Sequence, residues 1–492
     1  MIMYIRTPFI MLAVVGGILQ LGSLEGSAMN LNLACPWGDG CSPPQTPYLA
    51  FHSPQSDNLL FVSGDTIDLR CQAGLRSVAL RWTLHRNMVA KPFRSGTAEA
   101  LAGNRFQIAL ATAGLHPGFY DLKVELDTGL TNDAREPLAK RPVRGVCTFG
   151  WKAESMAVAD TRPADFTAFW DEAKAKLAKI PLDAKEGPTQ VFGPKAINDY
   201  NVMNACLPPD YDPDGHRAEQ VESCKVDFAG PDGGRVYGWL AKPARKGKFP
   251  AMLVLPGAGF AARPRPLEHA RHGYVALDIQ VHGQDVDLEK YPPIQSQGED
   301  APPTHYYHNV HLRCLQAVNY LLSRPDVDPS RIVLVGGSQG GRLGVVVAGL
   351  DPRIQAVVSC IANSPNQPHL AWVSSCNAAK VDGMDLAAAP PMPDTPEARC
   401  FAYYDPMNYA QDIHCPVLMN GGLIDPVSPP FSVWAVYNRL GTTAKKIVAI
   451  DGHAHDWSAE FDRRAWRWLD EVLAVPLRIQ QVLDVGSEPR SL

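Results

Sequence analysis

The sequence predicts an α/β fold with a doubly wound, mostly parallel sheet, preceded by a small N-terminal β-sandwich. Three observations lead to this prediction. From residue 250 onward, short apolar runs alternate with stretches of helical length. Between residues 45 and 150, short segments of strand length are separated by Gly, Pro and Asp turns. One of the later apolar runs leads directly into a Gly-x-Ser-x-Gly sequence. The first pattern indicates a sheet covered on both faces and the second a sandwich.

The first 28 residues have the pattern of a secretory signal peptide. Arg6 precedes an apolar run from Phe9 to Leu24, and Gly26-Ser27-Ala28 places small residues before a cleavage point. We therefore expect a secreted or periplasmic protein without a membrane span after cleavage. A retained membrane anchor is the alternative, although two adjacent glycines and a glutamine inside the run weaken a stable span.

Composition narrows the class of protein. The 492 residues are 46% hydrophobic and 20% charged, which suits a globular chain of two or three domains. The net charge is −5 and no long basic run occurs, so nucleic acid is not expected as a partner.

Eleven cysteines suit an exported protein with disulfides. Sequence alone cannot pair them, and the candidate pairs are Cys35 with Cys41, Cys71 with Cys147, and Cys206 with Cys224.

Residues 29–150 are expected to form the β-sandwich, similar in kind to an immunoglobulin domain. Four segments have the length and residue types of its strands: Thr66–Cys71, Val78–Thr83, Arg105–Leu110 and Tyr120–Leu126. The domain could bind glycans, or it could be an appendage that supports the structure or an oligomer. No exposed aromatic platform can be read from the sequence, which favours the second interpretation.

Residues 151–480 are expected to form the α/β domain, followed by a tail over 481–492. A first helix begins near Phe166, and residues 182–245 have the pattern of connecting strands and loops. Later helices are expected over Asn309–Ser323 and Phe431–Leu440. The strand candidates are Ala251–Leu255, Val275–Ile279, Ile332–Val335, Ala356–Cys360, Val417–Met419 and Ile447–Ile450. Residues 361–405 interrupt this rhythm, and we expect an insertion there over the carboxyl ends of the strands.

The sequence Gly336-Gly337-Ser338-Gln339-Gly340 follows the apolar run 332–335 and precedes another at 345–348. This arrangement of strand, sharp turn and helix is that of a nucleophile elbow, in which glycines let the strand and helix approach closely. Ser338 is therefore the candidate nucleophile of an acyl-transfer enzyme. The alternative is a tight turn whose serine only caps the following helix.

A serine nucleophile needs a base and an acid that orients the base. Asp425 follows the strand candidate Val417–Met419 in a Gly-rich turn, which places its carboxylate at the carboxyl edge of the sheet. It could instead only cap the helix that follows. His453 and His455 come after the next strand, and either could be the base, because their spacing does not separate them.

The oxyanion of an acyl transfer needs two backbone N–H donors. One is expected from Gln339, which follows the nucleophile. The other is expected from Ala258, in the loop after the strand candidate Ala251–Leu255, with Gly257 as the alternative. The remaining candidate residues do not predict a metal site. The row His305, His308, His311 and Cys314 spirals around a helix and does not present one ligand cluster. The acidic loop 210–214 lacks the spacing of a calcium site.

Several motifs resemble those of one esterase family. They are Pro163–Phe166 with Phe169-Trp170, His282-Gly283-Gln284, Val327–Ile332, Gly337–Gly341, Tyr404–Asn408, and Gly422–Pro430 with Ala435–Asn438. Over roughly residues 160–475 the chain is similar to the acetyl xylan esterase/cephalosporin-C deacetylase family, carbohydrate esterase family seven. The family has the α/β-hydrolase fold, a Ser-His-Asp triad and no metal or organic cofactor.

The resemblance implies a triad at Ser338, Asp425 and a histidine followed by an acid, which favours His455 over His453. It also implies removal of O-acetyl groups from sugars. The chain departs from the family at three places. His282 stands where the family has Arg, Arg342 where it has a third Gly after the elbow, and Pro256-Gly257-Ala258 where it has His-Gly-Tyr.

We therefore expect a serine esterase that deacetylates an oligo- or polysaccharide and that could form homo-oligomers. Two alternatives remain open. A serine peptidase or an esterase for larger acyl groups would use the same residues with a deeper pocket. A glycan-binding protein on a decayed hydrolase scaffold would keep the fold without the chemistry.

Overall fold

A computed structural model describes residues 49–74, 79–127, 143–203, 215–258, 262–288, 301–362, 366–379, 393–456 and 458–473. The expected signal peptide lies outside these residues, as do the acidic loop 210–214 and three of the cysteines, Cys35, Cys41 and Cys206. Among the described residues, the chain forms no helix whose length and apolar character would let it cross a bilayer.

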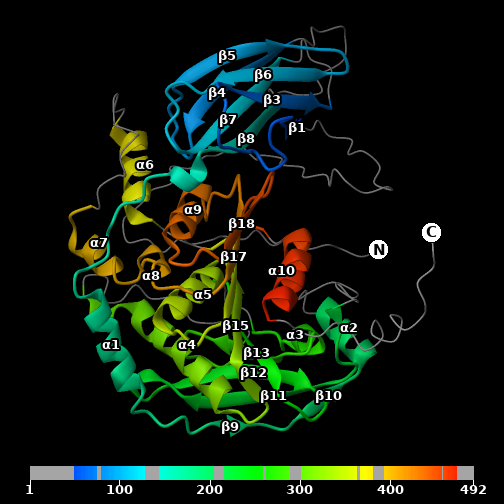
Figure 1. Ribbon diagram of the computed structural model, residues 1–492, viewed down its shortest axis with the longest axis vertical. Helices are drawn as coiled ribbons and strands as arrows, with labels where there is room; N and C mark the ends of the chain where they lie inside the picture. The colour runs from blue at the N-terminus through cyan, green and yellow to red at the C-terminus, as the bar shows by residue number, and fades with distance from the viewer. Residues whose placement is uncertain are drawn as a thin grey trace, which may run out of the picture.

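Two small sheets form the N-terminal β-sandwich (Figure 1). The first has the order β1-β3-β6, from strands Leu49–His52, Thr66–Ala73 and Arg105–Ala111. The second has the order β2-β8-β7-β4-β5, from strands Leu60–Phe61, Val143–Trp151, Gly118–Asp127, Ala79–Arg86 and Arg94–Glu99. Burial alternates along β6, as a strand with one face on a core requires. Cys71 and Cys147 lie in this core as free thiols, so this candidate pair is not bonded in the structure.

The C-terminal part is built on one ten-stranded sheet. Its order is β10-β11-β12-β14-β13-β15-β16-β17-β18, with β9 beside β11. The strands from β13 on are Phe249–Leu255, Val275–Gln280, Val327–Gly337, Ala356–Cys360, Val417–Gly422 and Lys445–Ile450. They pair in parallel from β14 to β18. This is the mostly parallel sheet that the apolar runs predict.

One edge of this sheet is antiparallel. Its strands are β9 (Lys185–Glu186), β10 (Gln190–Phe192), β11 (Val221–Ala229) and β12 (Arg235–Pro243). The sequence pattern indicated only connecting strands and loops in this region, because buried and half-buried residues largely alternate along β11 and no continuous apolar run marks it. Antiparallel strands near a sheet edge commonly show this alternation.

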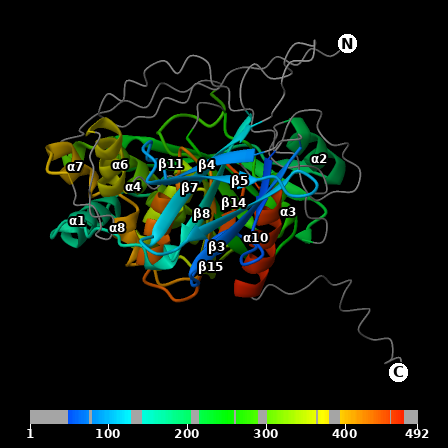
Figure 2. The same cartoon turned by 90° about the horizontal axis from the view of Figure 1, so that it is seen from above.

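Helices cover both faces of the sheet (Figure 2). On one face lie α10 (Ala459–Val472), α3 (Leu267–Arg271) and α2 (Pro194–Met203). The other face carries α1 (Phe166–Leu177), α4 (Tyr306–Ser323), α5 (Gln339–Leu350), α8 (Met407–Ala410) and α9 (Pro430–Arg439). The side chains of neighbouring strand residues point to opposite faces of the sheet. Val333 packs with the aromatic residues of α10, whereas Leu334 packs in the core with α4 and α5. The region expected as an insertion contains α6 (Gln367–Ala379) and α7 (Pro396–Phe401).

Candidate active site

Ser338 lies between the end of β15 and the start of α5, at the carboxyl edge of the parallel strands. Its backbone has φ 56° and ψ −118°, a conformation that L-residues rarely adopt. The Ser338 N–H donates to the carbonyl of Cys360 on the neighbouring strand at 2.9 Å. The surrounding structure thus fixes a strained turn that projects the serine from the edge of the sheet. The Ser338 side chain makes no capping hydrogen bond to the helix, which contradicts the alternative of a serine that only caps it.

The glycines around Ser338 fill positions where a side chain does not fit. A Cβ on Gly340 would lie 2.1 Å from the carbonyl oxygen of Leu255, and one on Gly336 would lie 2.5 Å from the Gly340 carbonyl carbon. Gly337 differs, because its nearest neighbour would be the Cβ of Cys360 at 3.8 Å. The close approach of β13, β15 and α5 therefore depends on Gly336 and Gly340.

His455 connects the serine to a carboxylate. Its Nε2 lies 2.8 Å from Oγ of Ser338, and its Nδ1 lies 2.8 Å from Oδ2 of Asp425. Three residues that are far apart in the sequence thus form one hydrogen-bonded chain. His453 contacts a different carboxylate: its Nδ1 lies 3.1 Å from Oδ1 of Asp456, and its side chain is 33% exposed.

Asp425 is fully withdrawn from solvent. Its Oδ1 accepts the backbone N–H groups of Val427 and Ser428, each at 2.8 Å. The following helix α9 has Pro429 at its N-cap position, so capping is not the role of Asp425. The two N–H bonds hold Oδ1 and leave Oδ2 directed at the imidazole of His455.

The loops that carry Asp425 and His455 contact each other through Gly422, the last residue of β17. A Cβ at Gly422 would lie 2.5 Å from the carbonyl oxygens of both His453 and Ala454. The N–H of Ile424 also donates to the carbonyl of His453 at 3.1 Å. The acid loop and the base loop are therefore packed together.

The expected oxyanion donors lie on both sides of the elbow. Gln339 is the first residue of α5, and the first N–H groups of a helix have no partner within it. Gly257 lies in the loop after β13, where an added Cβ would be 3.6 Å from the Gly337 carbonyl oxygen. Ala258 follows it and is exposed. Gly257 is thus adjacent to the serine turn, and Ala258 is the next residue of the same loop.

Sequence reasoning missed the groups around the Gln339 side chain, which is buried. The Tyr307 hydroxyl donates to its Oε1 at 3.3 Å, and its Nε2 lies 3.5 Å from Nε2 of His282. The hydroxyl of Tyr306 contacts the other ring nitrogen of His282. Burial and the nearby guanidinium of Arg313 lower the pKa of His282 to about 4. The departure from the family motif at His282 was the signal that could have pointed here.

The row of histidines on α4 packs among aromatic side chains. His305 stacks on Tyr404 at 4.2 Å, and His308 stacks on Trp170 at 5.4 Å. Burial lowers the pKa of His305 and His311, and the cationic side chain of Arg342 lowers both further. These neutral rings serve packing beneath the elbow.

One group of described side chains brings metal-type ligand atoms together. Atoms of His216, Glu268 and His272 lie within 4.8 Å of one another. Glu268 already contacts His216 at 2.5 Å, accepts from Asn201 at 2.9 Å and lies 3.6 Å from the guanidinium of Arg271. Because these donors already neutralise the carboxylate, the arrangement is that of a buried ion-pair network.

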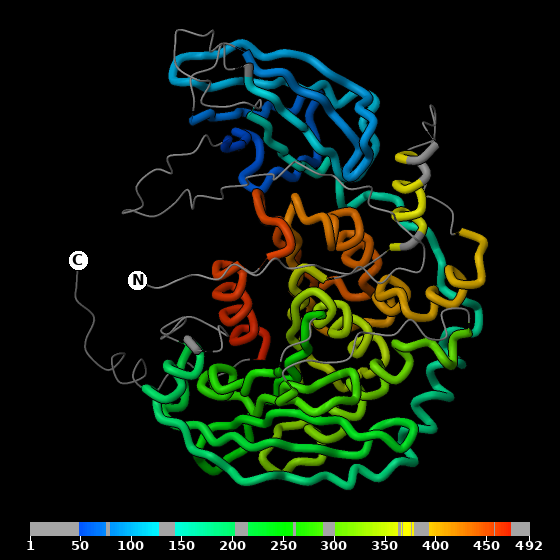
Figure 3. The backbone as a smooth tube through the Cα atoms, turned by 180° about the vertical axis from the view of Figure 1, so that it is seen from behind, coloured from blue at the N-terminus to red at the C-terminus, as the bar shows by residue number. Residues whose placement is uncertain are grey.

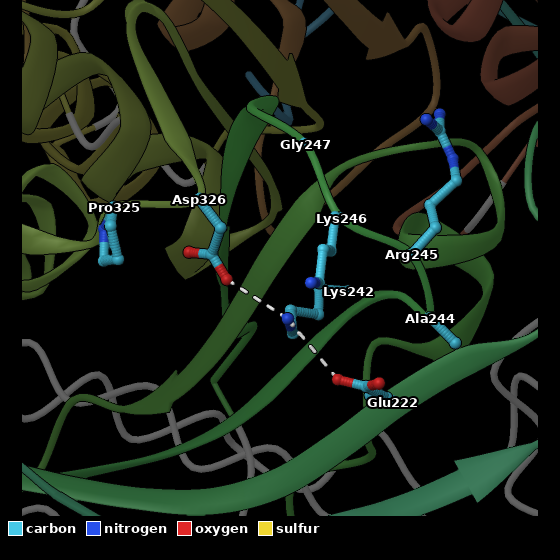
Figure 4. A pocket seen from close by; sticks show the side chains of 8 residues that line it. All are labelled: Glu222, Lys242, Ala244, Arg245, Lys246, Gly247, Pro325 and Asp326. Carbon is cyan, nitrogen blue, oxygen red and sulfur yellow. Dashed lines mark ion pairs between the residues drawn. The ribbon is translucent and has the colours of Figure 1, made fainter.

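A polar pocket of about 390 Å³ lies far from the elbow in the fold (Figure 4). It is found where β12 ends and where β13 and β15 begin, which is the edge of the sheet opposite to Ser338. Lys242 bridges Glu222 at 3.4 Å and Asp326 at 3.3 Å across it. Its cation is thus already paired, and the pocket has no part in the serine site.

Comparison with known proteins finds relatives over most of the chain. Residues 196–472, more than half of the chain, match the acetyl xylan esterase (AXE1) family. The chain is 26% identical over 446 residues to acetyl esterase Axe7A of Xylanibacter ruminicola, covering 87% of this chain and 91% of that protein.

A solved structure has the same fold. Acetyl xylan esterase 1 of Thermoanaerobacterium sp. JW/SL YS485 aligns with a TM-score of 0.50 and 20% identity, covering 65% of this chain and 97% of that one. The resemblance noted in the motifs is confirmed, and the chain is an esterase that belongs to the acetyl xylan esterase family.

Proposed function

We propose that this esterase removes O-acetyl groups from an acetylated oligo- or polysaccharide through a Ser338–His455–Asp425 triad and an acyl-enzyme. One observation carries the proposal: His455 lies 2.8 Å from both Ser338 Oγ and Asp425 Oδ2. Membership of the family supports a carbohydrate acetylesterase, and acetylated xylan is the substrate class that its name indicates.

In the first half of the reaction, Ser338 Oγ attacks the acetyl carbonyl carbon while its proton passes to Nε2 of His455. Asp425 keeps the Nδ1–H of His455 directed away from the serine and stabilises the imidazolium that forms. The negative charge on the carbonyl oxygen is held by the N–H groups of Gln339 and Ala258. Loss of one such donor typically lowers the rate by about 10²- to 10³-fold.

The tetrahedral intermediate then collapses. The sugar oxygen leaves with the proton from His455, and the acetyl group remains bound to Ser338 Oγ as an ester. Water gives a proton to the same imidazole and attacks the acetyl carbonyl carbon; the imidazolium then returns this proton to Ser338 Oγ as the ester bond breaks, which releases acetate and restores the serine. Every proton transfer uses His455 Nε2, so the mechanism needs only groups that this chain supplies.

The proposal is tested by acetate release from a panel of acetylated polysaccharides, with acetyl and longer-chain p-nitrophenyl esters and a peptide amide measured beside it. We expect acetyl esters to be preferred and Ser338→Ala to be inactive. Unchanged hydrolysis by Ser338→Ala would exclude the triad. Preference for long acyl chains or for the amide would favour the larger-substrate alternative. Glycan binding without labelling by a fluorophosphonate would indicate a decayed scaffold.

A further inference from the structure

The β-sandwich packs directly against the helix that follows the acid loop. Phe119 of β7 and Trp434 of α9 form an edge-to-face pair with ring centroids 4.9 Å apart, and both side chains are at most 2% exposed. The other side of Trp434 lies against β17, where a Cβ on Gly421 would be 2.8 Å from its ring. Trp434 thus connects the sandwich to the strand that ends just before Asp425.

The far end of α9 is held by the segment that leaves the sandwich. The amide of Asn438 donates to the carbonyl of Ala153 at 3.0 Å, and Arg439 donates to the carbonyl of Ala159 at 2.9 Å. Figure 3 shows α9 and this segment side by side below the sandwich. The helix is therefore bound along its length.

A second connection runs through α6. The Asn377 side chain accepts the N–H of Ala90 at 2.7 Å and donates to the carbonyl of Met88 at 3.1 Å, in the turn between β4 and β5. On the same helix, His369 stacks on Phe431 at 4.0 Å with an interplanar angle of 14°. Phe431 is in the first turn of α9. The sandwich thus reaches both ends of α9.

The position of α9 matters because of what precedes it. Only Pro429 separates its first residue, Pro430, from Ser428, whose N–H holds the Asp425 carboxylate. A shift of the helix start would move the two N–H groups that hold Oδ1. It would also move Oδ2 relative to His455. Displacements of about 1 Å in a catalytic group can lower a rate by about 10²-fold.

We infer that the β-sandwich positions the catalytic acid: Phe119 and Asn377 hold α9, and α9 holds the loop that carries Asp425. The N-terminal domain then contributes to catalysis by positioning Asp425, and it is not an attached glycan-binding module. The inference rests on the proposed role of Asp425. Phe119 and Asn377 are positioning residues, since neither touches the reacting atoms.

The test compares Phe119→Ala with Phe106→Ala. Phe106 is equally buried, on β6 of the opposite sheet, so its loss disturbs the sandwich core while the ring of Phe119 stays on Trp434. Steady-state kinetics with p-nitrophenyl acetate are measured at a temperature where circular dichroism shows both variants folded. We expect kcat of Phe119→Ala to fall about 10- to 100-fold with KM nearly unchanged. We expect kcat of Phe106→Ala to stay near that of the unmodified protein.

The pH profile separates positioning from general destabilisation. A looser Asp425 stabilises the His455 imidazolium less, so the acidic limb of kcat should move to lower pH in Phe119→Ala. Loss of folded protein alone would lower the amplitude without moving this limb. If Phe119→Ala fails to fold, Asn377→Ala serves instead, with the exposed Ser374→Ala on the same helix as its control. There we expect a smaller fall of kcat, about 3- to 10-fold, with the same shift.

Three results would overturn the inference. One is an unchanged kcat and pH profile in the folded positioning variants. Another is an equal fall of kcat in the test and control variants. The third is a change confined to KM on acetylated xylan, which would mark the sandwich as a carbohydrate-binding module.

Asp425→Ala is measured in parallel. If it retains full activity, the proposed triad fails. If it is inactive while Phe119→Ala is normal, only the positioning role fails.

Discussion

The Nδ1 atom of His455 lies 2.8 Å from Oδ2 of Asp425, although the two residues are 30 positions apart in the sequence. The other carboxylate oxygen is occupied by two backbone N–H groups, and the Asp425 side chain has no solvent exposure. The carboxylate therefore has one fixed orientation, and this orientation determines which nitrogen of His455 carries the proton.

Asp425→Asn should lower kcat by about 10⁴-fold with little change in fold. The N–H groups of Val427 and Ser428 would retain the amide oxygen, which turns the NH₂ group toward His455. Nδ1 of His455 must then accept a hydrogen bond from this NH₂ group, so the ring hydrogen lies on Nε2. In this tautomer Nε2 cannot take the proton of Ser338. Kinetics on p-nitrophenyl acetate measure this. Asp456→Asn is the control, and a similar loss there would contradict the assignment.

His455→Ala should abolish acetate release and fluorophosphonate labelling of Ser338, because no other described imidazole reaches its Oγ. His453→Ala should retain activity within about threefold, since its contact with Asp456 is partly exposed to solvent and contributes little. Both variants are assayed for acetate release from acetylated xylan. If His453→Ala were inactive and His455→Ala active, His453 and not His455 would be the catalytic base.

Gly340→Ala should lower the free energy of unfolding by more than about 2 kcal/mol or prevent folding. Its Cβ would lie 2.1 Å from the Leu255 carbonyl oxygen, and only backbone movement relieves that overlap. Gly337→Ala is the matched control, because its Cβ meets nothing closer than 3.8 Å. Urea unfolding of the two variants decides the matter, and equal stability would show that the elbow tolerates a wider separation of strand and helix.

Stability should fall as the pH drops from about 6.5 to 4. Burial lowers the pKa of His269 to about 4, and burial together with Arg86 lowers that of His369 to about 3. The unfolded chain binds protons at these sites below its normal histidine pKa, whereas the folded chain does not. Each such histidine therefore costs up to about 1.4 kcal/mol per pH unit in that window.

Thermal unfolding at pH 7.5, 5.5 and 4.5 measures this dependence. His269→Phe removes one buried titrating group, so its unfolding temperature should fall less over the same range. The unbonded Nδ1 of His269 also disappears in this variant, which should not reduce stability at neutral pH. A pH dependence as steep as that of the unmodified protein would contradict this account.

The parallel strands and the elbow were predictable from sequence because each has a local signature. Val417 and Gly340 belong to patterns that are complete within a dozen residues. The choice between His453 and His455 could not be made from spacing. It depends on how the base loop lies on Gly422, a contact between residues some 30 positions apart. The bounds of the strand Val221–Ala229 could not be predicted for a different reason: residues 182–245 had the pattern of connecting strands and loops, but no continuous apolar run marks where this strand lies.

The contacts of the Gln339 side chain were not predicted either, although the departure from the family motif at His282 was a signal. His282 approaches its side chain from 57 positions away, and Tyr307 from 32. Neither residue type indicates such a contact by itself. Only the fold brings the end of β14 and the start of α4 beside the first turn of α5.

The missing side chain at Gly422 has a consequence for enzyme engineering. The segments 422–428 and 451–456 are in backbone contact at Gly422, where no Cβ fits. The backbone path of each segment therefore depends on that of the other. If only one of them is replaced by the loop of a relative, this backbone contact is lost and the distance between Asp425 and His455 changes. The two segments should therefore be transferred together, with the glycine, when the acid and base loops are exchanged between esterases of this family.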